Sequence, residues 1–334
     1  MNVLVLGASG YVGSRLLALL RESGWARPVG ASSRARGEGQ VRVDVRDGAA
    51  LTEALRGMDA VVNCVAGDAT SIGQGARMLA EAAVAANCPR VIHLSTMSVY
   101  GAREGVVDEN AAPGPLLGWY DQAKRDAEQS LLHYTAKGGT LVILRPGCVW
   151  GAGSELWVGR VGRWLRSGRL GDLGEHGDGW SNLVHVDDVC VAVVRALQLP
   201  LAQGASCTYN LAAPDSPRWN EYFIDLALAI GATPVRRLGR RRLALDARVA
   251  GPVLHVTRKL LQRAGRVAQA IPEPITPGLL GLWQRHLHLD PRAAARDLVL
   301  DWTPYPVALS EAAAWFERQE SLERVKSHAA FIPG

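Results

Sequence analysis

The chain has 334 residues, of which 48% are hydrophobic and 21% charged, with a formal net charge of +5 at pH 7. This is the balance of an ordinary globular protein and excludes disordered and fibrous classes. The basic residues are mostly scattered, so the charge fits an anionic small molecule or weak attraction to an acidic membrane surface, and does not indicate nucleic acid.

Neither a secretory nor a membrane class is indicated. The first six residues lack a basic segment and are interrupted by Gly7, which favours a buried strand over a signal peptide. No apolar run approaches the ~20 residues that span a bilayer, so we expect no transmembrane segment. The cysteines form no Cys-x-x-Cys pair, so we expect reduced thiols, no metal site and a cytoplasmic location; they are Cys64, Cys88, Cys148, Cys190 and Cys207.

The first 150 residues alternate short apolar strands with helical segments. We predict strands at residues 3–6, 28–32, 41–43, 60–65, 90–94 and 140–144. We predict helices at residues 11–21, 49–55, 75–86 and 120–134. Strict alternation with near-continuous apolar strands predicts an α/β fold, a doubly wound parallel Rossmann sheet with helices on both faces.

Beyond residue 151 the alternation weakens, and eight of the ten tryptophans lie from Trp150 onward. One strand-like stretch, residues 207–211, is expected to return to the sheet. We therefore predict a nucleotide-binding Rossmann domain in residues 1–150, joined by residues 183–213, and a smaller substrate-binding lobe made mainly of residues 151–334. The basic, helical region 236–266 is interpreted as a solvated amphipathic face, with peripheral contact to an acidic membrane as the alternative.

A glycine-rich turn, GASGYVG at residues 7–13, directly follows the first strand and opens the first helix. Gly7 permits the tight turn, Gly10 lets the backbone approach a pyrophosphate, and Gly13 lets the helix pack closely on the sheet. The helix start offers free N–H groups and a positive dipole end to phosphates. The spacing differs from Gly-x-Gly-x-x-Gly, but its strand–helix setting favours dinucleotide binding over a plain turn.

The residues after the second strand bear on the choice of cofactor. An acidic residue there would accept hydrogen bonds from a ribose 2′-OH and favour NAD. The chain instead has Ser32, Ser33, Arg34 and Arg36, whose hydroxyl and guanidinium groups suit a 2′-phosphate. We predict NADP over NAD, the alternative being a solvated basic loop. Asp44, after the third strand, either bonds the adenine amino group or lies in a surface turn.

Tyr120 and Lys124 lie four residues apart, on one face of a predicted helix. A free tyrosine, with a pKa near ~10, is a poor acid or base at neutral pH. A neighbouring ammonium lowers that pKa by stabilising the phenolate, and can also bond a ribose. This spacing alone is common, but it follows a hydroxyl-rich strand end at residues 94–101, LSTMSVYG, and ligands of open α/β sheets bind beyond such ends.

These motifs occur in a fixed order with LRPG at residues 144–147 and VHVDDV at residues 184–189. The chain thereby resembles, over nearly its whole length, the extended short-chain dehydrogenase/reductase family, also called the NAD-dependent epimerase/dehydratase family. The stretch 177–182 is most similar to its ketone-reducing and 3-beta-hydroxysteroid-dehydrogenase-like branches. The resemblance implies that Tyr120 is the acid/base, Lys124 the ribose anchor, and Thr96 the hydroxyl that bonds the reacting oxygen, with Ser95 and Ser98 as alternates. A strand-capping role for Thr96 stays open.

The turn and the resemblance together yield a set of binding residues. The cofactor is expected to contact Gly7, Ser9, Gly10, Tyr11, Val12, Gly13, Ser33, Arg34, Arg36, Asp44, Val45, Ala66, Tyr120, Lys124 and Pro146. The substrate is expected to contact Ser98, Trp119, Cys148, Trp150 and Trp180, although tryptophans such as Trp150, Trp157, Trp164 and Trp180 are more often core residues. The helices that follow residue 75 and begin at Tyr120 are expected to form a homodimer interface, as in many relatives.

The chain departs from the family pattern at Ile72, and from the pattern of the nucleotide-sugar members at Cys148 and Ser181. Ile72 replaces an Asn of a proton relay, so any relay must use water or Ser71. Cys148 replaces an Asn and Ser181 an Arg that bind the substrate's diphosphate, although Arg160, Arg163, Arg166 or Arg169 could compensate. His185, Asp187 and Asp188 are interpreted as a helix start capped by Asp rather than as a metal cluster.

We therefore expect an NADP(H)-dependent oxidoreductase acting on the carbonyl or alcohol of a largely apolar small molecule. A nucleotide-sugar epimerase or dehydratase with tightly held NAD is the first alternative. A non-catalytic dinucleotide-sensing or partner-binding protein is the second, and the joint presence of Thr96, Tyr120 and Lys124 speaks against it.

Overall fold

The computed structural model describes residues 1–34, 39–245 and 273–329. The chain divides into two compact units. The first unit is formed by Met1–Gly147, Val184–Pro214 and Leu289–Trp302. The second is formed by Cys148–Leu183, Asp215–His288 and Thr303–Gly334. We predicted that the stretch 183–213 belongs to the first unit. Residues 289–302 also belong to it, but they contain no sequence motif from which this could be predicted.

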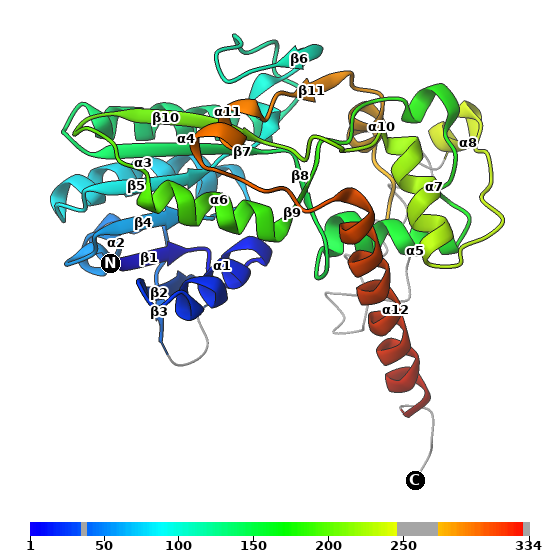
Figure 1. Cartoon of the computed structure of the whole chain (residues 1–334), viewed down its shortest axis with the longest axis horizontal. Helices are drawn as coiled ribbons and strands as arrows, with labels where there is room; N and C mark the ends of the chain where they lie inside the picture. Colours follow the sequence, from blue (N-terminus) through cyan, green and yellow to red (C-terminus); the bar gives the residue numbers. More distant parts are fainter. Residues whose placement is uncertain (35–38, 246–272, 330–334) are drawn as a thin grey trace. The chain divides into compact units, whose positions relative to one another are not determined.

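A seven-stranded parallel sheet is the centre of the first unit (Figure 1). Its strand order is β10-β7-β5-β4-β1-β2-β3. The strands are β1 (Asn2–Leu6), β2 (Arg27–Ser32), β3 (Gln40–Arg42), β4 (Ala60–Asn63), β5 (Arg90–Leu94), β7 (Thr140–Pro146) and β10 (Ser206–Leu211). The predicted doubly wound Rossmann fold is confirmed, and the strand order reverses between β1 and β4, where such sheets bind their ligands.

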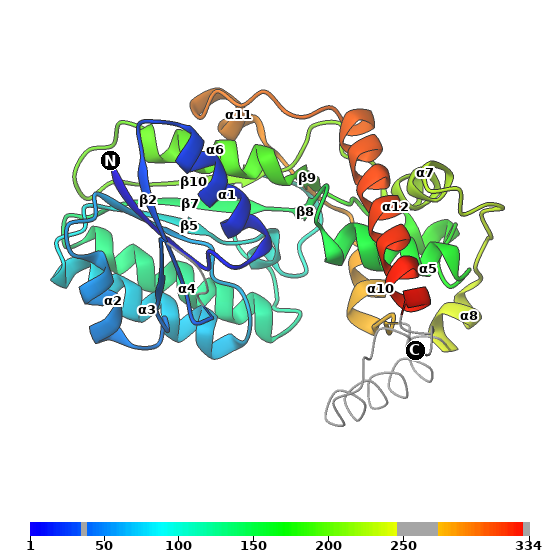
Figure 2. The same cartoon turned by 90° about the horizontal axis from the view of Figure 1, so that it is seen from below.

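Helices cover both faces of this sheet (Figure 2). α1 (Tyr11–Glu22) and α6 (Val186–Gln198) pack together on one face, and α2 (Gly48–Leu55), α3 (Ala69–Ala85) and α4 (Trp119–Thr135) pack on the other. The strands bury Leu4, Val61, Val91 and Ile143 against this second helix layer. Because side chains alternate along a strand, Asn63, His93, Ser95 and Arg145 point to the same face as these core residues. The remaining elements of this unit are β6 (Gly105–Val107) and α11 (Arg292–Asp297).

Two predicted boundaries differ from the structure for local reasons. α3 begins six residues before the predicted start at residue 75, because the Asp68 carboxylate caps it by accepting a 2.9 Å bond from the Ser71 N–H. The strand predicted at 60–65 ends at Asn63, since its side-chain oxygen accepts from the N–H of Val65 and turns the chain.

Helices packed on an aromatic core form the second unit. They are α5 (Arg160–Arg166), α7 (Trp219–Ala229), α8 (Arg240–Leu245), α10 (Pro277–Trp283) and α12 (Tyr305–Ala329). Trp164, Trp219, Trp283 and Phe223 are almost fully buried, and Phe223 meets Trp283 edge-on with ring centroids 5.1 Å apart. Short elements complete this part of the chain: β8 (Cys148–Trp150), η2 (Glu155–Gly159), η3 (Gly174–Gly177), and β9 (Leu183–His185) and β11 (Leu287–Leu289), where the chain passes between units.

Most of the basic region 236–266, for which a solvated face or a membrane contact was considered, lies outside the described residues. Within the described ranges, every helix is too short or too polar to cross a bilayer.

Candidate active site

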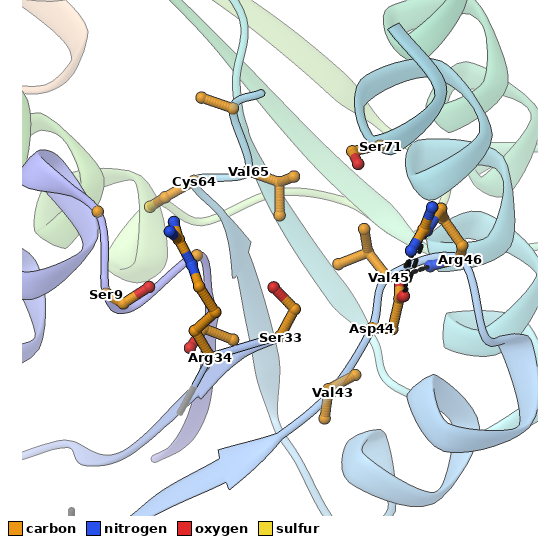
Figure 3. A pocket seen from close by; sticks show the side chains of 14 residues that line it. Ser9, Ser33, Arg34, Val43, Asp44, Val45, Arg46, Cys64, Val65 and Ser71 are labelled. Carbon is orange, nitrogen blue, oxygen red and sulfur yellow. Dashed lines mark hydrogen bonds and ion pairs between the residues drawn. The ribbon is translucent and has the colours of Figure 1, made fainter. Parts of the chain in front are cut away.

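A cleft of about 300 Å³ lies at the carboxyl ends of β1, β2, β3 and β4 (Figure 3). Because these four strands are neighbours in the sheet, the loops that follow them converge at one edge. Its size is at the lower end of the range for ligand pockets. It is lined by Gly7, Ser9, Gly10, Ser32, Ser33, Arg34, Val43, Asp44, Val45, Arg46, Cys64, Val65, Ala66 and Ser71.

The glycine-rich turn forms one wall of this cleft and depends on the absence of side chains. Gly7 has a φ of +77°, and a Cβ there would lie 2.8 Å from the Cys64 carbonyl oxygen. A Cβ on Gly13 would collide with the carbonyl oxygen of Gly7, so only glycine lets α1 approach the turn this closely. No side chain caps the start of α1 at Gly10, which leaves the helix N-terminus suited to a phosphate.

The end of β2 supplies hydroxyl and guanidinium groups to the cleft. Ser33 and Arg34 are exposed, whereas Ser32 is buried and its hydroxyl has no hydrogen-bond partner among the described residues. A buried polar atom without a partner is unfavourable unless a ligand or water satisfies it, so Ser32 fits a cofactor contact. Ser32 is one of the two serines whose hydroxyls were expected to suit a 2′-phosphate. Arg36 lies outside the described residues.

Asp44 and Arg46 form an ion pair at the cleft, and Ser33 lies between this pair and Arg34 (Figure 3). The Arg46 guanidinium donates to both carboxylate oxygens, at 3.0 Å from Nε and 2.6 Å from Nη2. This contact lowers the pKa of the Asp44 carboxyl to about 2. Of the described residues that line the cleft, Arg34 and Arg46 are cationic and Asp44 anionic, so the net charge favours an anion. Arg46 was not predicted from the sequence.

The cleft contains eight of the residues predicted to bind the cofactor: Gly7, Ser9, Gly10, Ser33, Arg34, Asp44, Val45 and Ala66. Tyr11, Val12 and Gly13 lie at the start of α1, behind the turn, and Pro146 ends β7. The lining residues that prediction missed besides Arg46 are Val43, Cys64 and Val65, while Ser71 was considered only for a proton relay. Burial raises the pKa of the Cys64 thiol to about 12, so this cysteine stays protonated at neutral pH.

Lys124 connects α4 to the end of β5. Its side chain is 3% exposed, and Nζ donates a 2.8 Å hydrogen bond to the carbonyl oxygen of Leu94. Burial lowers the pKa of the Lys124 ammonium to about 8. The ammonium therefore carries its charge at neutral pH inside the protein, where a charge acts more strongly than in water.

Thr96 follows two residues after Leu94 and is buried. Its hydroxyl oxygen accepts a 3.3 Å bond from the Ser98 N–H and so caps the turn η1 (Met97–Tyr100). Thr96 thus caps the turn that follows the strand rather than the strand itself. Its hydroxyl hydrogen is directed at the Ser98 hydroxyl oxygen, 3.5 Å away, a long bond that a ligand oxygen could replace. Ser98 is partly exposed beside it.

Tyr120 lies one helical turn before Lys124 on α4. Its ring is partly buried against the core beneath α4 and meets the ring of Trp119 edge-on, with centroids 5.7 Å apart. Trp119 itself is 58% exposed. The helix thus presents a phenol at the protein surface and an ammonium one turn further, in the buried layer.

His93 is a buried titratable group that sequence reasoning did not single out. Its Nδ1 lies 3.2 Å from the side-chain nitrogen of Asn63, and it is 1% exposed. Burial, and secondarily the Lys124 charge, hold the pKa of the imidazole well below its usual range, so it is neutral next to Lys124. A second cation is thereby avoided in this layer.

The predicted substrate contacts in the second unit are largely occupied by packing. Trp150 is 2% exposed and stacks on Tyr305 at 5.6 Å between centroids. Trp180 stacks on His288 at 4.1 Å, and the Arg218 guanidinium lies 4.4 Å from the same indole, so both ring faces are covered. Trp157 and Trp164 likewise contact other tryptophans. Trp150 and Trp164 are buried in the core of this unit, whereas Trp157 and Trp180 are packed against other rings but partly exposed.

The positions that would contact a diphosphate are also occupied. Cys148 is 3% exposed, and burial raises the pKa of its thiol. Ser181 is fully buried and contacts the Ser216 hydroxyl at 2.9 Å. The arginines that could compensate are engaged within the unit: Arg160 and Arg163 pair with Glu273, Arg166 with Glu317 and Glu320, and Arg169 donates to the Glu273 carbonyl.

The start of α6 corrects one expectation. The N-cap residue is His185, without a side-chain cap, whereas Asp187 and Asp188 lie in the first turn. Asp187 accepts two bonds from Arg15 of α1, at 2.5 and 2.7 Å, because the two helices pack side by side. Across the described part of the chain, no three His, Cys, Asp or Glu residues cluster closely enough to hold a metal ion.

Comparisons with known proteins agree with this arrangement. The model of the NAD dependent epimerase/dehydratase family matches residues 3–212. Protein YeeZ of Escherichia coli (strain K12) is 32% identical over 161 residues, covering 48% of this chain and 53% of that relative, so the match spans about half of its length. The 2-alkyl-3-oxoalkanoate reductase of Stenotrophomonas maltophilia is 30% identical over 258 residues, covering 70% of this chain and 77% of the reductase.

Among solved structures, the UDP-glucuronic acid 4-epimerase from Bacillus cereus in complex with NAD superposes with a TM-score of 0.72, covering 96% of this chain and 98% of the epimerase. At 18% identity this likeness supports the fold alone. The family match, the reductase and the sheet carry the assignment. The chain belongs to the NAD-dependent epimerase/dehydratase family and is an NAD(P)-dependent enzyme of the extended short-chain dehydrogenase/reductase kind.

Proposed function

We propose that the protein is an NADP(H)-dependent oxidoreductase that interconverts a carbonyl and an alcohol in a largely apolar small molecule. One observation carries the proposal. The buried Lys124 ammonium, one helical turn after Tyr120 on α4, donates to the carbonyl of Leu94, which precedes Thr96 by two residues. This arrangement is suited to proton transfer at a carbonyl oxygen.

When bound, NADP(H) supplies the hydride. In the reducing direction, the Tyr120 hydroxyl donates a proton to the substrate oxygen, while the Thr96 hydroxyl donates a hydrogen bond to that oxygen. The charge of Lys124 stabilises the phenolate that remains on Tyr120, and its ammonium would donate a hydrogen bond to the cofactor's ribose. Tyr120 acts as the base in the reverse direction.

The choice of NADP rests on Ser33 and Arg34 at the end of β2. Both line the cleft, and Asp44, the acidic residue among the described lining residues, is already paired with Arg46. A 2′-phosphate would meet cationic and hydroxyl donors there rather than an unpaired carboxylate.

The choice of an apolar substrate rests on what the second unit offers. Cys148 and Ser181 are buried, and Arg160, Arg163 and Arg166 pair with carboxylates, so these residues are poor diphosphate ligands. The similarity to a 2-alkyl-3-oxoalkanoate reductase supports a ketone with alkyl groups over a nucleotide sugar.

A cofactor-consumption screen tests the proposal. NADPH and NADH are offered with a panel of ketones and aldehydes, and with UDP-sugars as the competing class. We expect NADPH oxidation with apolar ketones and its loss by about 10²–10⁴-fold in Tyr120→Phe, since the general acid is removed. Turnover of UDP-sugars alone, with cofactor retained through dialysis, would instead identify an epimerase.

A further inference from the structure

The residues directly before Tyr120 present apolar side chains to water. Leu116, Leu117 and Trp119 are 42%, 52% and 58% exposed. Single exposed apolar residues are ordinary in a protein surface. Here three of four consecutive residues are exposed and apolar, and we call Leu116, Leu117 and Trp119 the apolar platform. Clustered exposed apolar side chains commonly mark binding sites.

The backbone of the platform is held in place although its side chains are exposed. The buried Asp121 carboxylate accepts a 2.9 Å bond from the Leu117 N–H. Upstream, the Pro115 carbonyl accepts a 2.8 Å bond from Ala102, and the Gly114 carbonyl a 2.6 Å bond from Arg125. These bonds come from two separate parts of the first unit, so the exposure does not arise from a fraying chain end.

The platform adjoins the proposed catalytic phenol, because the Trp119 ring meets the Tyr120 ring edge-on at 5.7 Å between centroids. A substrate whose oxygen lies at the Tyr120 hydroxyl would extend its next atoms over Trp119. The run from Pro113 to Trp119, PGPLLGW, contains no charged side chain. The side chains of this surface suit hydrocarbon and carry no charge that would pair with a diphosphate or a carboxylate.

We propose that Leu116, Leu117 and Trp119 bind a hydrocarbon chain attached to the substrate's carbonyl group, so the substrate class is a ketone with an alkyl or prenyl-like chain of several carbons. This inference rests on the proposed function, because it takes Tyr120 as the position of the reacting oxygen. The occupant is the substrate's own chain, while a second copy of the protein is the rival occupant.

The test is a series of methyl ketones from 2-butanone to 2-undecanone. Each buried methylene is expected to raise kcat/KM by about threefold to fourfold until the platform is covered. In Leu117→Ser and Trp119→Ser this increase per methylene is expected to fall to less than about half. The matched control is Leu322→Ser, since Leu322 is 53% exposed on α12 and should keep the wild-type slope.

Binding measurements separate this inference from the proposed function. The affinity of Tyr120→Phe for the same ketones, with NADP bound, is measured by calorimetry and needs no turnover. The affinity is expected to rise with the chain length of the ketone, and this rise is expected to vanish when Leu117→Ser is added. That result would support the platform even if no ketone were reduced. A chain-length slope unchanged in both Leu117→Ser and Trp119→Ser would overturn it, even with ketone reduction intact. Dissociation of a dimer in sedimentation by either variant, with the slope unchanged, would assign the patch to a second copy.

Discussion

The Lys124 ammonium on α4 donates a 2.8 Å hydrogen bond to the Leu94 carbonyl at the end of β5. This bond fixes a buried charge beside the hydroxyl-rich strand end and one helical turn from Tyr120. Burial makes the charge effective, and it also lowers the pKa of the ammonium to about 8. Both effects can be measured separately.

The rate of carbonyl reduction should depend on the protonation of Lys124. Its ammonium is charged below its pKa and neutral above it, so support for the Tyr120 phenolate is lost as the pH rises. We expect kcat to fall above an apparent pKa of about 8. Lys124→Met should have a low kcat at every pH and lack this alkaline limb. An alkaline limb at the same pH in Lys124→Met would contradict the assignment.

The free energy of unfolding should also report on Lys124. Because its pKa is lower in the folded than in the unfolded protein, the unfolded chain binds more protons between about pH 8 and the unperturbed lysine value near ~10.4. Stability contributed by this group therefore rises with pH across that window. Lys124→Met should remove the rise and stabilise the protein at pH 7 by about 1–3 kcal/mol. Urea unfolding at both ends of the window tests this, with the exposed Lys137→Met as control.

Arg34 should determine much of the preference between cofactors. Loss of one charge-assisted hydrogen bond costs about 1.5–3 kcal/mol, so Arg34→Gln should weaken NADPH binding by about 10-fold to 100-fold. Binding of NADH should change little, since it has no 2′-phosphate. Fluorescence titration with both nucleotides measures this. Arg27→Gln is the matched control because Arg27 is exposed at the opposite end of the same strand. Equal losses for both nucleotides in Arg34→Gln would argue against 2′-phosphate recognition.

The first unit should depend on the ion pair between Arg145 of β7 and Glu128 of α4. Arg145 donates to both carboxylate oxygens, at 3.0 and 2.7 Å, and the side chains are only 15% and 9% exposed. Glu128→Gln leaves the guanidinium charge buried without its counter-ion and should cost about 3–5 kcal/mol of unfolding free energy.

A surface pair provides the comparison for this ion pair. Arg56 and Glu53 are 70% and 69% exposed, so Glu53→Gln should cost no more than about 1 kcal/mol. Chemical denaturation of Glu128→Gln and Glu53→Gln measures the unfolding free energy lost in each variant. Similar costs would show that burial does not strengthen the Arg145–Glu128 pair.

The sequence alone determined the local elements and the order of the motifs. The strands can be predicted because short, continuous apolar runs are typical of strands buried on both faces of a sheet. The turn at residues 7–13 can be predicted because a side chain on Gly7 or Gly13 would collide with the nearby backbone. Tyr120 and Lys124 could be paired in advance because helical spacing is fixed by the backbone.

Only the tertiary structure decided which of these groups have partners and how deeply they are buried. The pairing of Asp44 with Arg46, the unsatisfied hydroxyl of Ser32 and the lowered pKa of Lys124 depend on surroundings assembled from distant segments. The same holds for Trp150 and Trp180, whose rings are covered by Tyr305 and His288 from much later in the chain. Desolvation and ring stacking depend on residues that are distant in the sequence, so they cannot be predicted from the spacing of residues along the chain.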